Sequence, residues 1–215
     1  KMSVSIKSQK EIELMRHAGK LLEEVFMSME EIIKPGISTL DIDKICEERI
    51  RSFGCIPNFL NYEGYPASVC TSVNEAVVHG IPRKDYYLFE GDIISLDCGL
   101  IYNGYHSDCA RTYPVGKISA GAQRLIDVTK QSFFEGIKYA SEGHHLHEIS
   151  AAIGNYAESF GYGVVEALVG HGIGKALHED PAVPNFPCKS RGIMLRPGMT
   201  LAIEPMINEG NHEVE

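Results

Sequence analysis

The sequence predicts an α/β protein that contains the same helix–helix–strand unit twice. Four segments place apolar residues at helical spacing, and glycines end these segments at matching places. The second copy lies 107 positions after the first, because Gly36 matches Gly143 and Gly54 matches Gly161. A repeat of this length indicates one structural unit used twice, packed about a pseudo-twofold axis.

The four predicted helices cover residues 10–33, 39–52, 120–140 and 146–160. Pro35 and the glycine after it end the first helix. Ser38 or Thr39 can cap the second helix, and Gly54 ends it. We therefore expect pseudo-repeats over about 10–113 and 118–215, within a single domain that spans residues 1–215.

A carboxylate follows an apolar run in each copy. Asp97 comes after the run 93–96, and Glu204 comes after the run 201–203 at the same offset of 107 residues. Packing about a pseudo-twofold axis would bring the two acids together. Two acids in a core are costly unless a cation lies between them, so we expect a metal ion there. The alternative is that helix-ending glycines match by chance.

Residues 92–113 are typical of a β-hairpin with Asn103-Gly104 at its tip. A two-residue turn at this place would set Gly99 opposite Asp108. Asp97 would then lie on the same face as Asp108, two residues along its strand from Gly99. Two converging carboxylates favour a metal site, and a pair of exposed strand aspartates is the alternative.

Two histidines lie in unusual surroundings. His171 lies between glycines in the segment 170–174, which indicates backbone packed closely against another part of the chain. His79 follows what we expect to be an apolar strand, at residues 77 and 78. A structural polar role is the alternative for either histidine. The candidate metal ligands are Asp97, Asp108, His171 and Glu204, a set that suits Mn, Fe, Co or Zn and implies a two-metal site.

Composition excludes several classes of protein. The net charge is −9 and no basic tract is present, so we expect no nucleic-acid binding. No apolar run approaches the roughly 20 residues that a membrane span needs. Six cysteines without a CxxC pair favour free thiols and a cytoplasmic location.

These residues, taken in order, resemble the type I methionine aminopeptidases from about Ile12 to Glu215. The motifs are Asp97 with Asp108, Gly170–Gly174 followed by His178-Glu179-Asp180-Pro181, Ile203-Glu204-Pro205, Tyr62–Pro66 with Ser68-Val69-Cys70, and Asn74-Glu75 with His79–Pro82. Each motif alone is moderately specific, and the ordered set is highly specific. The resemblance implies the pita-bread fold, a curved antiparallel sheet with helices on its outer face.

The resemblance also implies a reaction, namely removal of the initiator methionine from nascent proteins when the second residue is small. Asp97, Asp108, His171 and Glu204 would bind two divalent ions (Co, Mn, Fe or Zn), and Glu204 would also take part in proton transfer. His79 and His178 would contact the scissile peptide. The expected substrate-binding residues are Phe59, Tyr62, Tyr65, Cys70, His79, Leu177 and His178. Nascent chain N-termini are the expected partners, with a monomeric enzyme working near the ribosome.

The chain departs from the family pattern near its end. The family's fifth ligand, a glutamate in a later strand, has no counterpart, so we expect that the sequence lacks a C-terminal part. Tryptophan is absent from the whole chain. Two alternatives stay open at this point: a proline-specific peptidase of the same fold, and a binding module of this fold without catalysis.

Overall fold

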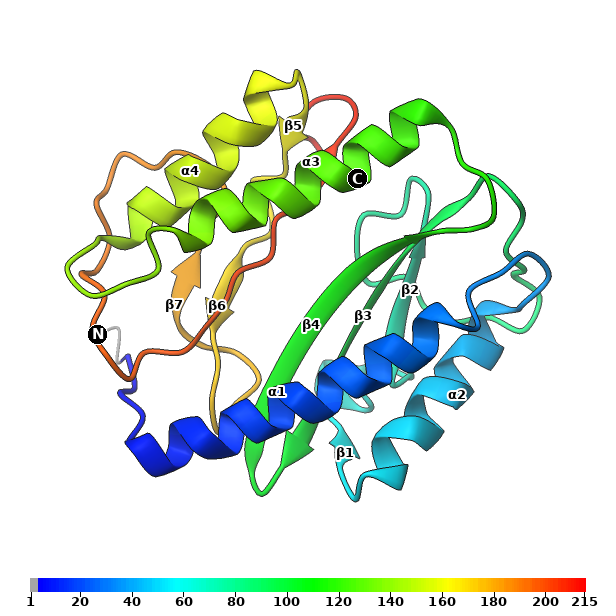
Figure 1. Cartoon of the computed structure of the whole chain (residues 1–215), viewed down its shortest axis with the longest axis horizontal. Helices are drawn as coiled ribbons and strands as arrows, with labels where there is room; N and C mark the ends of the chain where they lie inside the picture. The colour runs from blue at the N-terminus through cyan, green and yellow to red at the C-terminus, as the bar shows by residue number, and fades with distance from the viewer. Residues whose placement is uncertain (1–3) are drawn as a thin grey trace. The chain divides into compact units, whose positions relative to one another are not determined.

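The computed structural model describes residues 4–215 and divides the chain into two compact units. The hairpin unit consists of Lys10–Ala122 together with Gly174–Leu177. Among the described residues, the histidine unit consists of 4–9, Gln123–Ile173 and His178–Glu215. Each unit combines two helices with antiparallel strands, which confirms the predicted α/β class (Figure 1). The assignment of residues 1–215 to a single domain stays a prediction, and residues 1–3 lie outside the described part.

The hairpin unit is organised around one long strand. Its elements are α1 (Gln9–Glu30), α2 (Thr39–Ser52), β1 (Ile56–Pro57), the 3₁₀ turn η1 (Tyr62–Gly64), β2 (Val69–Val73), β3 (Ile93–Tyr102) and β4 (Tyr105–Pro114). Strand β3 pairs antiparallel with β1, β2 and β4. Residues on β3 are therefore held from both sides.

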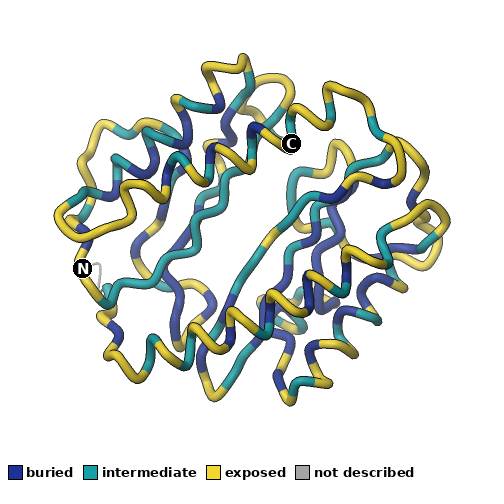
Figure 2. Tube along the Cα trace, in the orientation of Figure 1, coloured by how far each residue is buried: buried dark blue, intermediate teal, exposed yellow. Residues whose placement is uncertain are grey.

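The core of the hairpin unit lies between the two helices and the sheet. Phe26 of α1, Ile42 of α2 and Leu96 of β3 belong to one buried cluster and are fully buried. Figure 2 shows buried and exposed residues alternating along α1 and α2, as expected for helices with one face on a sheet. The helices thus cover the face of the sheet on which Leu96 lies.

The tip of the β3–β4 hairpin sets the register of both strands. Asn103 and Gly104 have φ angles of 48° and 81°, the left-handed values that a type I′ turn requires. Tyr102 therefore pairs with Tyr105, and Gly99 pairs with Asp108, as the sequence predicts.

The histidine unit carries two helices and five short strands. Its elements are α3 (Ala120–Ile137), α4 (Leu146–Ser159), β5 (Gly163–Val164), β6 (Gly170–Gly172), β7 (Glu179–Val183), β8 (Leu201–Ala202) and β9 (Ile207–Asn208). Strand β6 pairs with β7 and β8, and β5 pairs with β9. Ile149 and Ile153 of α4 are fully buried against Val183 and Leu195.

The offset of 107 residues recurs in the element bounds and in the strand register. Helix α2 covers Thr39–Ser52 and helix α4 covers Leu146–Ser159, which are 107 positions apart. The same offset relates the pairing of Ile56 with Ile101 to the pairing of Gly163 with Asn208. A shared offset in pairing partners means that the two copies share hydrogen-bonding geometry as well as helix positions.

Several expected boundaries were wrong. Helix α1 ends at Glu30 and helix α3 ends at Ile137, each three residues before the predicted end. Asp97 lies inside β3, because that strand continues to the hairpin tip beyond the apolar run. Among residues 4–215, none of the helices combines the length and apolar character that a membrane crossing needs.

Asp43 of α2 fixes the start of β2. Its Oδ1 accepts hydrogen bonds from the backbone N–H groups of Ser68, at 2.8 Å, and Val69, at 3.1 Å. Burial raises the pKa of the Asp43 carboxyl, although the two N–H groups act in the opposite direction. Folded-state burial therefore favours the protonated acid.

Asp43→Asn is expected to be at least as stable as the native chain at pH 7, because an amide oxygen keeps both hydrogen bonds without a charge to desolvate. A raised folded-state pKa means that the contribution of Asp43 to stability is fully present below about pH 4 and is lost as the pH rises through that pKa. The advantage of the asparagine variant should therefore appear only as the pH rises. Urea unfolding at acidic and neutral pH measures it.

Asp43→Ala is the matched control, because it leaves two buried N–H groups without an acceptor. It should lower the free energy of unfolding by about 1–3 kcal/mol at either pH. An asparagine variant as unstable as the alanine variant at pH 7 would contradict this account.

Candidate functional site

Two of the predicted metal ligands lie on one face of the hairpin unit's sheet. Asp97 pairs with Cys70 of β2, and Gly99 pairs with Asp108 of β4. Residues two apart on a strand share a face, and directly paired residues share it too. Asp97 and Asp108 are therefore diagonal neighbours, with Cys70 on the same face.

Asn58 occupies the space that a side chain at position 99 would fill. A Cβ on Gly99 would lie 2.2 Å from the Ser107 carbonyl oxygen and 2.6 Å from the side-chain amide of Asn58. Asn58 Nδ2 donates to that carbonyl at 3.0 Å, and its backbone N–H donates to the Gly99 carbonyl at 3.2 Å. Asn58 therefore ties β3, through its backbone N–H, to β4, through its side chain, beside Asp108. Sequence reasoning missed Asn58, because a lone asparagine after a short strand carries no recognisable signal.

The predicted substrate-binding residues all belong to the hairpin unit, apart from His178. The Tyr62 N–H donates to the Phe59 carbonyl at 2.9 Å, which forms the turn at η1. The Tyr65 hydroxyl lies 3.2 Å from the Val69 carbonyl oxygen and 3.1 Å from the Gly80 carbonyl oxygen, and it donates between them. Tyr65 thus joins this turn to β2 and to the residue that follows His79.

The thiol of Cys70 is neutral at physiological pH. Burial raises its pKa to about 12, and the negative charge of Asp97 acts in the same direction. Leu177, in the segment Gly174–Leu177, is 3% exposed. Phe59, Cys70 and Leu177 are therefore buried, uncharged side chains suited to an apolar ligand group.

The expectation of a strand before His79 was wrong. Strand β2 ends at Val73, and residues 77 and 78 belong to the loop that follows it. His79 has a φ angle of 58° and an exposed side chain. The next residue, Gly80, returns to β2, where its carbonyl accepts the Thr71 N–H at 2.7 Å. The loop therefore presents His79 at its end, in a left-handed conformation that is uncommon for residues other than glycine.

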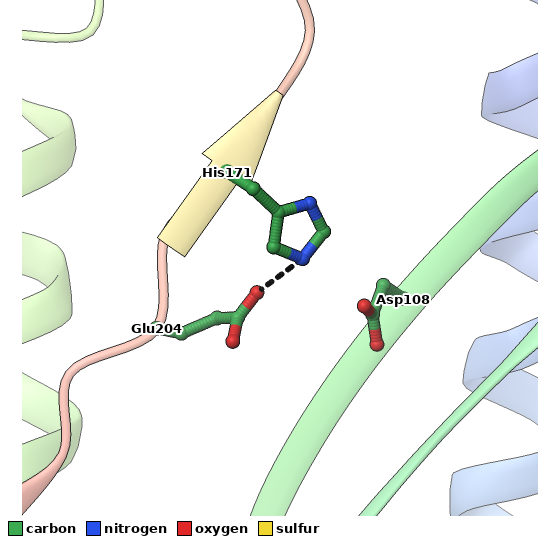
Figure 3. A group of neighbouring side chains, drawn as sticks. All are labelled: Asp108, His171 and Glu204. Atoms are coloured by element: carbon green, nitrogen blue, oxygen red, sulfur yellow. Dashed lines mark ion pairs between the residues drawn. The ribbon is translucent and has the colours of Figure 1, made fainter. Parts of the chain in front are cut away.

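In the histidine unit, His171 on β6 lies beside Glu204. Figure 3 shows the two side chains pointing toward each other. His171 Nε2 lies 2.9 Å from Glu204 Oε1. Figure 3 also draws Asp108, which belongs to the hairpin unit. Glu204 lies two residues beyond β8, and its backbone carbonyl accepts a hydrogen bond from Asn185 Nδ2 at 2.8 Å.

The glycines beside His171 are required by close backbone approach, as the sequence predicts. A Cβ on Gly170 would lie 2.3 Å from the Ala202 carbonyl oxygen, and one on Gly172 would lie 2.2 Å from the Asp180 carbonyl oxygen. Strands β7 and β8 therefore enclose β6 from both sides. The register shifts between His171 and Gly172, which re-aims the histidine.

The chemistry of this pair fits a cation. His171 Nδ1 lies 2.8 Å from the Gly172 carbonyl oxygen. A carbonyl only accepts, so Nδ1 carries the proton and Nε2 is the nitrogen that can bind a metal. Glu204 Oε1 is buried and has no hydrogen-bond partner among the described residues, although Nε2 lies 2.9 Å away. Two electron-rich atoms that face each other in this way suit a metal ion between them.

His178 lies next to His171 in the same unit. The two imidazole rings meet edge to face, with centroids 4.3 Å apart. His178 immediately precedes β7, and its side chain is exposed. Three predicted residues, His171, His178 and Glu204, are therefore close together within the histidine unit.

Known proteins match nearly the whole chain. The model of metallopeptidase family M24 matches residues 13–214. The methionine aminopeptidase of Clostridium acetobutylicum is 53% identical over 212 residues, which cover 99% of this chain and 85% of that protein. The crystal structure of methionine aminopeptidase from Rickettsia prowazekii has a TM-score of 0.96 at 39% identity, covering 98% of this chain and 85% of that one. The prolidase from Pyrococcus furiosus has a TM-score of 0.76 at 22% identity, covering 93% of this chain and 57% of that one, and shows the fold alone.

Gly172→Ala is expected to lower the free energy of unfolding by about 1–3 kcal/mol, because the added methyl group meets the rigid backbone of Asp180. Gly19→Ala is the matched control, since its Cβ would meet no atom within 4 Å on the exposed side of α1. That change should raise stability by about 0.5–1 kcal/mol. Urea unfolding compares the two variants, and equal effects would contradict the packing argument.

Proposed function

The chain belongs to metallopeptidase family M24 and is an aminopeptidase that removes the N-terminal methionine of polypeptides; we propose here which residues bind the metal ions and the substrate. The observation that carries the assignment of the site is the buried Glu204 Oε1, which lies 2.9 Å from His171 Nε2 and has no hydrogen-bond partner among the described residues. A cation beside this atom would offset the cost of its burial, which supports a metal ion at this site.

The proposed metal ligands are Asp97, Asp108, His171 and Glu204. Together they would hold two divalent ions from the group Co, Mn, Fe and Zn, because carboxylates with one imidazole suit these metals. When bound, such ions would polarise the substrate carbonyl and lower the pKa of water toward neutrality.

The remaining steps belong to the chain's own side chains. His79 and His178 would hold the scissile peptide and stabilise the charge that develops on its carbonyl oxygen. The Glu204 carboxylate would take a proton from the attacking water and pass it to the departing amine nitrogen. Phe59, Tyr62, Tyr65, Cys70 and Leu177 would enclose the methionine side chain, because thioether sulfur packs well against aromatic rings. A small second residue would be preferred.

The setting of the reaction is also part of the proposal. Substrates are the N-termini of nascent chains, met by a monomeric enzyme that works near the ribosome in the cytoplasm. The six cysteines form no disulfide in the described structure, which suits a reducing compartment.

Incubation with Mn²⁺ or Co²⁺ should make the chain release free methionine from a Met-Ala-Ser peptide, and a chelator should stop the release. Asp108→Ala and His171→Ala should each reduce the rate by about 100-fold or more. Mutating a residue that only supports a metal ligand already costs about 10- to 100-fold, and losing a ligand itself costs at least as much. Chromatography of free methionine measures the rate, and elemental analysis measures bound metal.

Asp127→Ala is the matched control, because Asp127 is an exposed carboxylate on α3 whose side chain accepts a hydrogen bond from Gln123. It should leave both the rate and the metal content unchanged. Methionine release that persists in the presence of the chelator, or an Asp108→Ala variant as active as Asp127→Ala, would refute the proposed ligand set. A chain that binds no metal would instead favour the binding-module alternative.

A further inference from the structure

The described N-terminal segment carries a buried lysine that the proposed reaction does not use. Only 6% of the Lys7 side chain is exposed, and its Nζ donates to Glu179 Oε2 at 2.6 Å. Nζ also donates to Ser5 Oγ, and that hydroxyl donates to the same carboxylate oxygen at 2.6 Å. A buried ammonium group is costly unless it is paired with a negative charge. The burial of Lys7 therefore depends on its ion pair with Glu179.

Glu179 lies beside two predicted site histidines, next to His178 in the sequence and paired with the neighbour of His171. It is the first residue of β7, directly follows His178, and pairs with Gly172 of β6. Its carbonyl oxygen and that of Asp180 approach Gly172 so closely that a Cβ there would lie 3.0 Å and 2.2 Å away, respectively. The backbone of Glu179 is therefore fixed beside His171, while Lys7 fixes its side chain.

The same N-terminal segment also packs on the chain that leads toward Glu204. The Lys7 N–H donates to the Gly198 carbonyl at 2.7 Å. A Cβ on Gly198 would meet Ile6 and the Lys7 carbonyl oxygen, each at 2.7 Å. Two neighbouring residues of the N-terminal segment thus contact the approach to β8, and Lys7 also binds the start of β7.

We propose that Lys7 is a positioning residue for the reaction, acting through Glu179 to hold the His178 imidazole against His171. The inference rests on the proposed role of His178 at the substrate. His178 directly precedes Glu179, so the strand start that Lys7 binds also holds the backbone from which the His178 ring extends. The observed edge-to-face contact, with centroids 4.3 Å apart, is the arrangement that Lys7 would maintain.

The experiment compares Lys7→Met with Lys7→Arg in the full chain. Lys7→Met should lower kcat for a Met-Ala-Ser peptide by roughly 10- to 100-fold, because small displacements of a positioned group have effects of this size. KM should change less than kcat, and Lys7→Arg should recover most of the rate. Lys138→Met is the control, because Lys138 pairs with Glu135 at the exposed end of α3 in the same unit. It should leave kcat unchanged.

A second readout does not depend on turnover. The ring signal of His178 in a histidine-labelled chain can be assigned by its loss in His178→Ala and followed by NMR. Lys7→Met should shift this signal, whereas Lys7→Arg and Lys138→Met should not. In the His178→Ala background, Lys7→Met should cause no further loss of rate, since the two changes remove one coupled effect.

The outcomes separate the two claims. An unshifted His178 signal, or equal rate losses from Lys7→Met with and without His178, would overturn the positioning role. A His178→Ala variant with the native rate would instead refute the proposed role of His178. If Lys7→Met does not fold, Lys7→Met with Glu179→Met avoids an unpaired buried carboxylate and undergoes the same two measurements. Native rate and an unshifted signal in that double variant would also overturn the proposal.

Discussion

Strand register is the constraint that places Asp97 and Asp108 on one face of the sheet. Side chains alternate between the two faces of a strand, so a shift of one residue in the pairing of β3 with β4 would move Asp108 away from Asp97. The left-handed turn at Asn103-Gly104 sets that pairing, and Asn58 ties the strands again several residues from the tip. A turn of two residues and one buried amide therefore determine which functional groups share a face.

A different device positions the imidazole. His171 lies on the three-residue strand β6, which pairs with β7 and β8. The backbones of these two strands approach so closely that they leave no room for a side chain at Gly170 or Gly172. The Gly172 carbonyl then selects the ring nitrogen that faces Glu204. Sheet register places the carboxylates, whereas steric enclosure places the histidine.

The predictable part of this structure is the part encoded locally. The caps and glycine stops located helices α2 and α4 closely, and Asn103-Gly104 predicted the pairing of Gly99 with Asp108. The contributions of Lys7 and Asn58 could not be predicted, because each depends on a partner far away in the chain that no local pattern indicates. The strand expected before His79 was wrong for a related reason, since two adjacent valines are compatible with a partly exposed loop as well as with a strand.

The two units do not coincide with the two sequence repeats. The segment Gly174–Leu177 belongs to the hairpin unit although both of its flanks belong to the histidine unit, and residues 4–9 belong to the histidine unit although the rest of α1 does not. A chain cut after Ala122 would give two fragments, each lacking a piece of its own unit. If the repeat arose by gene duplication, these exchanged segments would have made the copies mutually dependent, so that neither could later be lost or inherited alone.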